Sequence, residues 1–265
     1  MQYKCESTMS LSESQRERYS RQLVLPGFGD EGQQRLLAGK VLLIGAGGLG
    51  SAAGLYLAAS GVGTIGVVDG DRVDLSNLQR QILHRTADLG RAKAASGTER
   101  MRAVNPDVKV LPHPVRFEAV NALALLQDYD FVIDATDNFP TKFLIADACH
   151  LAGKPYAHAG IRAYTGQTMT VLPGRSACYR CVFGGPPAPG TEPTGAQTGV
   201  LGAVPGVIGS IQATEAIKFL LGSGALLTDR LLVYDALNMT FRRVAVQRNP
   251  DCPLCGESPR IRSLA

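Results

Sequence analysis

The stretch "KVLLIGAGGLGS", residues 40–51, indicates how this chain folds. Four apolar residues lead into a turn in which Gly45, Gly47 and Gly50 fit the pattern G-x-G-x-x-G, and small residues at helical spacing follow. Glycines at this spacing let the backbone approach a phosphate group, and the N-terminus of the next helix attracts the anion. The stretch therefore predicts a β-strand, a phosphate-binding loop and a helix.

Apolar runs and helical patterns alternate along the chain from residue 40 to about residue 160. The expected strands are 40–44, 64–69, 108–112, the apolar part of 129–138, and 155–160, and the expected helices are 48–60, 91–104, 118–127 and 139–152. This alternation is typical of parallel strands joined by right-handed helical crossovers. It predicts an α/β fold with a Rossmann-like, mostly parallel twisted sheet that has helices on both faces.

After residue 160 the pattern changes. Residues 166–173 alternate as in a half-exposed strand, and 230–236 and 241–247 predict two late strands, which we expect to pair antiparallel. The stretch 184–199 holds four prolines and five glycines and predicts a mobile loop. A mostly apolar helix is expected over 204–221.

Length, composition and charge exclude several classes of protein. The chain has 265 residues, of which 45% are hydrophobic and 19% charged, with a net charge of +4. This small, scattered excess does not predict nucleic-acid binding. No run of about 18 apolar residues predicts a membrane span, and the polar N-terminus does not resemble a secretory signal. We therefore expect a cytoplasmic protein that has no membrane partner.

One domain accounts for nearly all of the predicted elements. We expect a flexible leader over residues 1–14 and a single domain over 15–265. Its nucleotide-binding half would run to about residue 160, after two short helices at 14–22 and 30–37. The second half, from residue 161, would hold the mobile loop and the late strands.

An acidic residue supports the nucleotide prediction. Asp69 ends the expected second strand, 24 residues after Gly45, where a carboxylate bonds a ribose hydroxyl. The alternative is a tight strand–helix turn without a ligand. A nucleotide that donates a hydride would need an acid or base beside the nicotinamide. None of the four histidines (His84, His113, His150 and His158) lies in a recognisable catalytic setting.

Four polar clusters favour phosphate chemistry instead: RYSRQ (18–22), SNLQRQ (76–81), GRAK (90–93) and ATDN (135–138). They offer Arg21, Arg80 and Lys93 as cations, which a triphosphate needs as charge builds on its leaving pyrophosphate. They also place Asp137 at the carboxyl end of a strand, where ligands bind in such sheets. A carboxylate there suits a Mg²⁺ ion that bridges phosphates.

The motifs together resemble a known family. RYSRQ, GAGGLG, VVDGDRVDLSNLQRQ, GRAK, DATDNFPTK, CYRC and RNPDCPLCG are similar, in this order, to motifs of the MoeB/ThiF family of ubiquitin-activating-type adenylyltransferases for sulfur-carrier proteins. The resemblance runs from about residue 14 to residue 256. It implies ATP- and Mg²⁺-dependent adenylation of the C-terminal Gly-Gly carboxylate of a small ubiquitin-like carrier. The carboxylate would attack the α-phosphate, and sulfur would later replace AMP.

The resemblance also implies roles for single residues. Asp69 would bind the ribose, Asp137 would bind Mg²⁺ with Asn138 beside it, and Arg21 would reach the phosphates of the other subunit of a homodimer. The remaining implied nucleotide contacts are Gly45, Gly47, Gly48, Gly50, Ser76, Asn77, Arg80 and Lys93. Of all these residues, Arg21, Arg80, Lys93 and Asp137 would carry the catalysis.

The cysteines form two C-x-x-C pairs, Cys178 with Cys181 and Cys252 with Cys255. Four thiolates are enough to close a tetrahedral Zn²⁺ site, which would tie the middle of the chain to its C-terminus and leave no open position for catalysis. The alternative is a thioredoxin-like redox pair. It is disfavoured here because neither pair is expected to open a helix after a strand.

The chain departs from the family where many members carry a further cysteine in the mobile loop. Gly195 occupies that place, and the hydroxyls of Thr191, Thr194 and Thr198 are poor substitutes for a thiolate. Cys149 lies in a core-like helix pattern, and Cys5 lies in the leader. We therefore expect adenylation without a covalent carrier–enzyme step. Since no rhodanese segment is recognisable, the sulfur would come from a separate donor.

Three alternatives to this interpretation remain open. A nicotinamide-dependent oxidoreductase would use the same glycine-rich loop. A non-catalytic docking module for a ubiquitin-like protein would need the fold without the charged residues. Some members of the family modify a peptide C-terminus or a tRNA base, and no feature of this sequence separates those substrates from a carrier protein.

Overall fold

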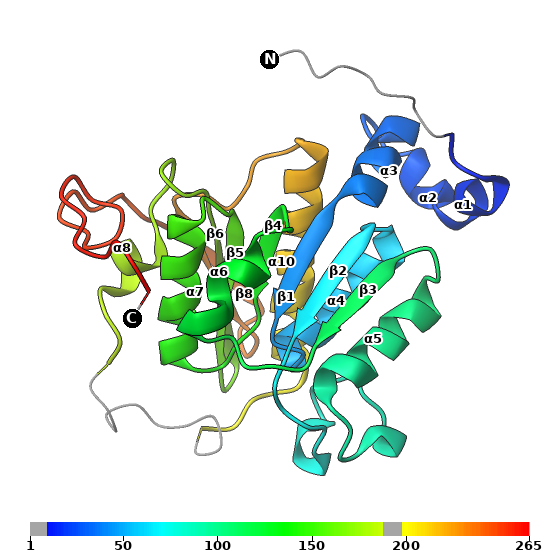
Figure 1. Cartoon of the computed structure of the whole chain (residues 1–265), viewed down its shortest axis with the longest axis horizontal. Helices are drawn as coiled ribbons and strands as arrows, with labels where there is room; N and C mark the ends of the chain where they lie inside the picture. Colours follow the sequence, from blue (N-terminus) through cyan, green and yellow to red (C-terminus); the bar gives the residue numbers. More distant parts are fainter. Residues whose placement is uncertain (1–9, 188–197, 265) are drawn as a thin grey trace.

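One mixed sheet of eight strands organises the computed structural model, which describes residues 10–187 and 198–264 (Figure 1). The strands are β1 (Lys40–Ile44), β2 (Thr64–Val68), β3 (Lys109–His113), β4 (Phe131–Asp134), β5 (Tyr156–Arg162), β6 (Thr165–Val171), β7 (Arg230–Asp235) and β8 (Thr240–Ala245). Their order across the sheet is β3-β2-β1-β4-β5-β6-β7-β8. The first five strands pair in parallel and the last three add antiparallel. The predicted fold class is therefore confirmed.

Helices connect the strands and cover both faces of the sheet (Figure 1). They are α1 (Glu13–Arg18), α2 (Ser20–Leu23), α3 (Gly29–Ala38), α4 (Gly48–Ser60), α5 (Lys93–Val104), α6 (Ala119–Leu126), α7 (Phe139–Leu151), α8 (Tyr179–Phe183) and α10 (Ala203–Leu221), with the 3-10 turns η1 (Leu75–Asn77) and η2 (Thr86–Asp88). None of these described helices is long and apolar enough to cross a membrane.

Two hydrophobic cores lie on opposite faces of the sheet. Alternate residues of β1 point to different sides: Val41 and Leu43 pack with α4, α5 and α10, whereas Leu42 and Ile44 pack with α6 and α7. This arrangement explains why the sequences of the parallel strands are continuous apolar runs, since both faces of these strands are buried. Gly209 lets α10 approach α4, because a Cβ there would lie 2.3 Å from the carbonyl oxygen of Leu49.

The structure departs from the predicted elements at several boundaries. The helix expected over 14–22 is interrupted at Tyr19, whose ψ of 9° leaves the helical range, so that α1 and α2 are separate. Strand β5 runs to Arg162, beyond the predicted end at residue 160, because it pairs with β6 along its whole length. The most consequential difference is helix α8, which was not predicted, and Cys178 is its N-cap. Strand β6 precedes this helix, so the expectation that neither cysteine pair opens a helix after a strand is wrong for the first pair.

Candidate nucleotide site and cysteine cluster

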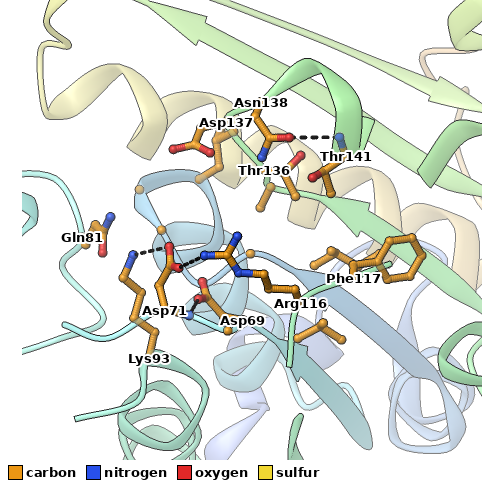
Figure 2. Close-up of a pocket in the computed structure, with 18 of the residues that line it drawn as sticks. Asp69, Asp71, Gln81, Lys93, Arg116, Phe117, Thr136, Asp137, Asn138 and Thr141 are labelled. Atoms are coloured by element: carbon orange, nitrogen blue, oxygen red, sulfur yellow. Dashed lines mark hydrogen bonds and ion pairs between the residues drawn. The ribbon is translucent and has the colours of Figure 1, made fainter. Parts of the chain in front are cut away.

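A cleft of about 360 Å³ opens at the carboxyl ends of the parallel strands (Figure 2). It lies where β1 and β4 are neighbours and their helices, α4 and α7, leave toward opposite faces of the sheet. Ligands of open α/β sheets bind at this switch point. The β1–α4 loop, the end of β2, the β4–α7 connection and residues 115–118 line the cleft.

The glycine-rich loop combines packing positions with lining positions. Gly45 has a φ of +100°, and a Cβ there would lie 2.7 Å from the carbonyl oxygen of Ala135. At Gly50 a Cβ would lie 2.0 Å from the carbonyl oxygen of Gly45, so only glycine allows the start of the loop to pack against the first turn of α4. Gly47 and Gly48 line the cleft at the N-terminus of α4. The backbone N–H groups of this first turn have no intrahelical partners, as an anion site requires.

Asp69 is held in place by the loop that it faces. Its carboxylate accepts hydrogen bonds from the backbone N–H of Ala46 and the backbone N–H of Asp71, each at 2.8 Å. Each carboxylate oxygen still has a free lone pair for a hydroxyl group of a ligand. The position suits the predicted ribose contact.

Cationic side chains reach the cleft from three segments. Lys93 begins α5, and its Nζ lies 3.6 Å from the carboxylate of Asp71. Arg116 approaches the same carboxylate at 3.8 Å and its side chain is 77% exposed. Arg80 donates to the side-chain oxygen of Asn77 at 3.0 Å and is half-buried. All three lie within reach of an anion, and none is bound into a close ion pair.

The opposite side of the cleft belongs to the β4–α7 connection (Figure 2). Asp137 is exposed and makes no hydrogen bond or ion pair within the described part of the chain. Asn138 is the N-cap of α7, and its side-chain oxygen accepts from the backbone N–H of Thr141 at 2.9 Å. Thr136 also lines the cleft. A lone carboxylate here faces the cations across the cavity.

Most of the predicted nucleotide residues come together. Those that line the cleft are Gly45, Gly47, Gly48, Asp69, Arg80, Lys93, Asp137 and Asn138. Gly50, Ser76 and Asn77 do not line it. Gly50 serves loop packing, whereas Ser76 and Asn77 act on Arg80, which donates to the backbone oxygen of the first and the side-chain oxygen of the second.

Arg21 lies far from the cleft of its own chain. Its neighbour Gln22 donates to the backbone oxygen of Ser60, at the C-terminal end of α4, whereas the cleft is at the N-terminal end of that helix. Helix α4 has 13 residues and is therefore about 20 Å long, which separates Arg21 from the cleft. Arg21 itself is exposed on α2.

Several lining residues were not predicted. Asp71 and Gln81 lie inside motifs that the sequence analysis quoted, and Gln81 directly follows Arg80. Gln81 is 4% exposed, and its side-chain oxygen is buried without a partner in the described structure. Arg116 and Phe117 come from the irregular connection between β3 and α6, which carries no recognisable pattern.

The histidines of the core are bound to the fold rather than open to a substrate. His84 shares hydrogen bonds of 2.9 Å with the Ser96 hydroxyl and the backbone oxygen of Ala46 in the glycine loop. Burial lowers the pKa of His84, so its ring is neutral at pH 7. His158 is buried as well, in a separate polar network beneath the cleft.

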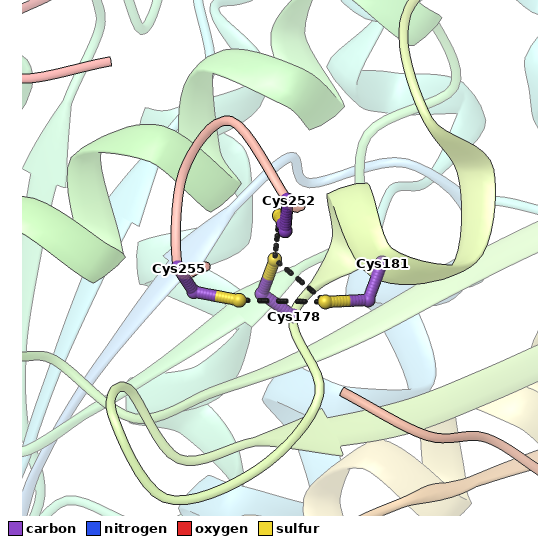
Figure 3. A group of neighbouring side chains, drawn as sticks. All are labelled: Cys178, Cys181, Cys252 and Cys255. Atoms are coloured by element: carbon purple, nitrogen blue, oxygen red, sulfur yellow. Dashed lines mark hydrogen bonds between the residues drawn. The ribbon is translucent and has the colours of Figure 1, made fainter. Parts of the chain in front are cut away.

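The four paired cysteines meet in one cluster at the end of the molecule that holds α8 (Figures 1 and 3). Their sulfur atoms all lie within 4.8 Å of one another. Three Sγ–Sγ distances are 3.7, 3.6 and 3.3 Å, close to the ~3.8 Å expected between thiolates around a tetrahedral Zn²⁺. Cys178 and Cys181 come from α8 and its N-cap, and the other two from the C-terminal loop.

Helix α8 is fixed to the rest of the fold independently of the cluster. Arg180 makes a two-point ion pair with Asp147 of α7, at 2.7 and 2.8 Å, and its guanidinium lies over the ring of Phe143.

Burial raises the pKa of Cys178 far above its ordinary value and that of Cys255 to about 11. Thiolates at these positions therefore need a cation beside them. The donor set and its spacing fit a closed metal site.

Cys149, the other cysteine of the described structure, belongs to neither site. Cys149 is fully buried in α7, as its helix pattern predicts, and burial raises the pKa of its thiol well above the usual range. Cys5, Gly195, Thr191 and Thr194 lie outside the described residues. The prediction about the loop position therefore stays a prediction.

Comparison with known proteins places this geometry in a family. The sequence model of the ThiF family matches residues 19–254. The chain belongs to the ThiF family. It is 47% identical over 261 residues to a sulfur carrier protein adenylyltransferase of Thermus thermophilus, covering 97% of this chain and 96% of the relative. It is 50% identical to a SAMP-activating enzyme E1 of Haloferax volcanii, over 94% of this chain and 92% of that protein.

Solved structures support the same fold. A crystal structure of MccB from E. coli matches with a TM-score of 0.81 and 23% identity, over 93% of this chain and 76% of that chain. At this identity the match concerns the fold alone. The ThiF-family membership confirms the resemblance inferred from the sequence motifs, which run through both halves of the chain.

Proposed function

We propose that this ThiF-family chain adenylates the C-terminal Gly-Gly carboxylate of a small ubiquitin-like sulfur-carrier protein, using ATP and releasing pyrophosphate. The observation that carries the proposal is the cleft at the β1–β4 switch point. There Asp137, which has no partner among the described residues, faces the cations Arg80, Lys93 and Arg116. The relatives that match nearly the whole chain carry names of this activity. No histidine of the described chain lines the cleft, which disfavours a dehydrogenase that uses a histidine as its acid or base.

The residues of the cleft have distinct roles in this reaction. Asp69 bonds the ribose, and the first turn of α4 receives phosphate oxygens at its free N–H groups. Arg80 and Lys93 stabilise the charge that develops on the leaving pyrophosphate. Because positioning and charge stabilisation suffice for attack of a carboxylate on the α-phosphate, the chain needs no nucleophile of its own.

Asp137 is the residue that would hold Mg²⁺. It is an exposed carboxylate without a partner in the described structure, and hard oxygen ligands of this kind are those that Mg²⁺ prefers. When bound, the ion neutralises phosphate charge and orients the triphosphate. Asn138 caps α7 through its side-chain oxygen, which holds the backbone directly after Asp137.

The cysteine cluster would hold a structural Zn²⁺. Four sulfur atoms at tetrahedral spacing leave no open position for a substrate. The cluster would fasten the C-terminal loop to α8. With these assignments the chain acts as one adenylation domain in the cytoplasm, and a separate protein or small donor supplies the sulfur.

Arg21 acts in a homodimer in this proposal. It lies at the far end of α4 from its own cleft, so it could reach only the cleft of a second copy. Mixed dimers of Arg21→Ala and Asp137→Ala chains test this, because each hybrid dimer assembles one complete site. A random mixture should recover about a quarter of the wild-type rate. Recovery at the level of the separate variants would place Arg21 outside the site.

The test of the activity itself is ATP–pyrophosphate exchange with Gly-Gly-ending carriers of the same organism, added one at a time. Exchange with one carrier, lost when its terminal glycine is deleted, establishes adenylation and identifies the partner. Binding of a carrier without exchange would instead support the docking-module alternative.

A further inference from the structure

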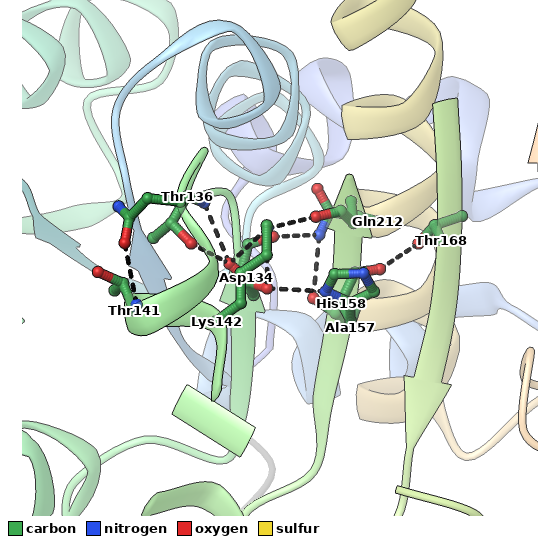
Figure 4. A network of polar contacts seen from close by, with 10 residues as sticks. Asp134, Thr136, Thr141, Lys142, Ala157, His158, Thr168 and Gln212 are labelled. Carbon is green, nitrogen blue, oxygen red and sulfur yellow. Dashed lines mark hydrogen bonds and ion pairs between the residues drawn. The ribbon is translucent and has the colours of Figure 1, made fainter. Parts of the chain in front are cut away.

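A buried ionic network lies beneath the cleft, and the reaction proposed above does not use it (Figure 4). It joins Asp134 at the end of β4, Lys142 on α7 and His158 on β5. The side chains are 1%, 7% and 1% exposed. None of the three lines the cleft, so any effect of theirs on a nucleotide must act through other residues.

Asp134 is the centre of the network. One carboxylate oxygen accepts from the backbone N–H of Thr136 at 3.1 Å and from its hydroxyl at 2.7 Å. The other accepts from His158 Nδ1 at 2.9 Å, and the ammonium of Lys142 contacts both oxygens. The bonds to Thr136 fix the backbone immediately before Asp137. These bonds link the Asp134 carboxylate to the backbone that leads to Asp137.

The hydrogen-bond pattern determines the form of His158. A carboxylate can only accept, so Nδ1 must carry the hydrogen. Burial lowers the pKa of His158 despite its bond to Asp134, which leaves the ring neutral and Nε2 unprotonated. The ring packs against Tyr179 and Phe183 of α8, with centroid distances of 4.5 and 5.7 Å. These contacts fix the direction of the Nδ1–H bond.

We propose that His158 is a positioning residue of the nucleotide site: its Nδ1–H holds the Asp134 carboxylate in the orientation that binds Thr136 and presents Asp137 to the cleft. The proposal rests on the function assigned to Asp137 above. Lys142 already balances the charge of Asp134, so the histidine is not needed for neutrality. The Lys142 ammonium is shared between this carboxylate and the backbone oxygen of Ala159. The His158 Nδ1–H is instead a single directional donor, and it binds the carboxylate oxygen that Thr136 does not bind.

Two substitutions separate positioning from packing. His158→Phe keeps an aromatic ring against Tyr179 and Phe183 but removes the donor to Asp134. His158→Asn places an amide N–H where Nδ1 lies but removes the ring. A packing role predicts that the phenylalanine variant resembles the wild type, whereas a positioning role predicts that the asparagine variant does.

The first measurement uses no substrate. Hydrogen exchange of the Thr136 backbone amide, which donates to Asp134, should become about tenfold faster in His158→Phe, since a hydrogen bond to a charged group is worth about that factor. His158→Asn should restore slow exchange. Equal protection in the wild type and the phenylalanine variant would overturn the proposal.

The second measurement is the Mg²⁺ concentration for half-maximal ATP–pyrophosphate exchange, together with calorimetric binding of a Mg²⁺-loaded, non-hydrolysable ATP analogue. His158→Phe should raise that concentration about tenfold, and saturating Mg²⁺ should restore most of the maximal rate. An unchanged Mg²⁺ requirement would refute the positioning role. A wild type without any exchange would refute the proposed function instead, while the Thr136 amide would still test the network.

A second pair of variants covers the case in which His158→Phe does not fold. Thr136→Val removes the hydroxyl donor at the other end of the same link, and Thr136→Ser keeps it. The valine variant should need more Mg²⁺ than the serine variant. Identical requirements in the two would show that Asp134 does not act through Thr136.

Discussion

The cleft and the cysteine cluster both gather chemically active side chains from distant segments, but they arrange them in opposite ways. In the cleft, Asp137 is exposed and without a partner in the described structure, and Arg116 stays 3.8 Å from the nearest carboxylate. In the cluster, four sulfur atoms lie within 4.8 Å of one another and three of the cysteines are buried. Open spacing suits a ligand that arrives and leaves, and closed spacing suits an ion that stays.

The electrostatic consequences differ in the same way. Asp137 and Arg116 are exposed charges of opposite sign in the cleft, and leaving them without a ligand costs the fold little. The cluster would place several thiolates side by side in a buried region, which is unfavourable unless a cation is bound. The stability of the fold should therefore depend on the cysteine cluster, whereas the activity of the protein should depend on the cleft. Four predictions test that division.

The largest effect is expected from removal of the metal. Chelation under mild denaturation should lower the melting temperature by more than about 10 °C, because a structural metal contributes several kcal/mol to folding. Scanning calorimetry with metal analysis of the same sample measures this. Cys149→Ala, a buried cysteine outside the cluster, is the matched control and should retain the metal. An unchanged melting curve after verified metal loss would contradict a structural role.

The next effect concerns the cleft. Asp137→Asn should reduce ATP–pyrophosphate exchange about 10³-fold, because it removes the charge that would hold Mg²⁺. Its melting temperature should stay within about 1 °C of the wild type, since the side chain is exposed and unpaired. Asp107→Asn, an exposed change outside the cleft, should alter neither quantity. Retained exchange in Asp137→Asn would remove this residue from the metal role.

These two regions were not equally predictable from the sequence. The spacing of the cysteines alone predicts their site, because few structures other than a metal site use four thiols in two C-x-x-C pairs. The glycine loop, Asp69 and Asp137 were predicted because each follows a continuous apolar strand, which fixes their common edge. Lys93 was predicted from the polar cluster GRAK. Arg116 and Phe117 were missed because they lie in an irregular connection, where no periodicity indicates which side chains face the cleft.

Two further features could not be read from the sequence for physical reasons. Helix α8 has five residues, too few for a helical period to show, and it forms because Arg180 binds Asp147 on another helix. The pairing of Asp134 with His158 joins neighbouring strands that are separated by a whole helix in sequence. Such contacts follow from strand order, which the sequence pattern implies but does not specify residue by residue.

A smaller effect is expected from the network that lies between the two regions. Burial opposes ionisation of Asp134, but the charge of Lys142 and the hydrogen bond from His158 outweigh it and lower the pKa of Asp134 to about 2. A carboxyl whose pKa is lower in the folded state stabilises the fold above its unfolded pKa of 3.8. This contribution, about 2 kcal/mol, is lost as the pH falls from about 4 toward 2.

Denaturant unfolding at pH 7 and at pH 3 measures about half of this contribution, because a carboxyl with a pKa of about 2 is still mostly ionised at pH 3. The double variant Asp134→Asn, Lys142→Met removes both charges together and avoids an unpaired buried ammonium. Its free energy of unfolding should fall less between the two pH values than that of the wild type. Parallel losses in the two proteins would mean that other carboxyl groups account for the acid sensitivity.

The smallest effect should come from Arg116→Ala. This substitution tests whether nucleotide binding can change while the stability of the fold does not. Its ion pair with Asp71 is long and its side chain is 77% exposed, so the melting temperature should change by no more than about 1 °C. Binding of an ATP analogue should weaken roughly fivefold, because the negatively charged phosphates lose one cation near the cleft, and the loss should shrink at high salt. Arg35→Ala breaks another exposed ion pair, with Glu31 on α3, outside the cleft, and should leave nucleotide binding unchanged. If both variants bind the analogue like the wild type, Arg116 is a solvated arginine at the rim, and the cations that serve the nucleotide are Arg80 and Lys93.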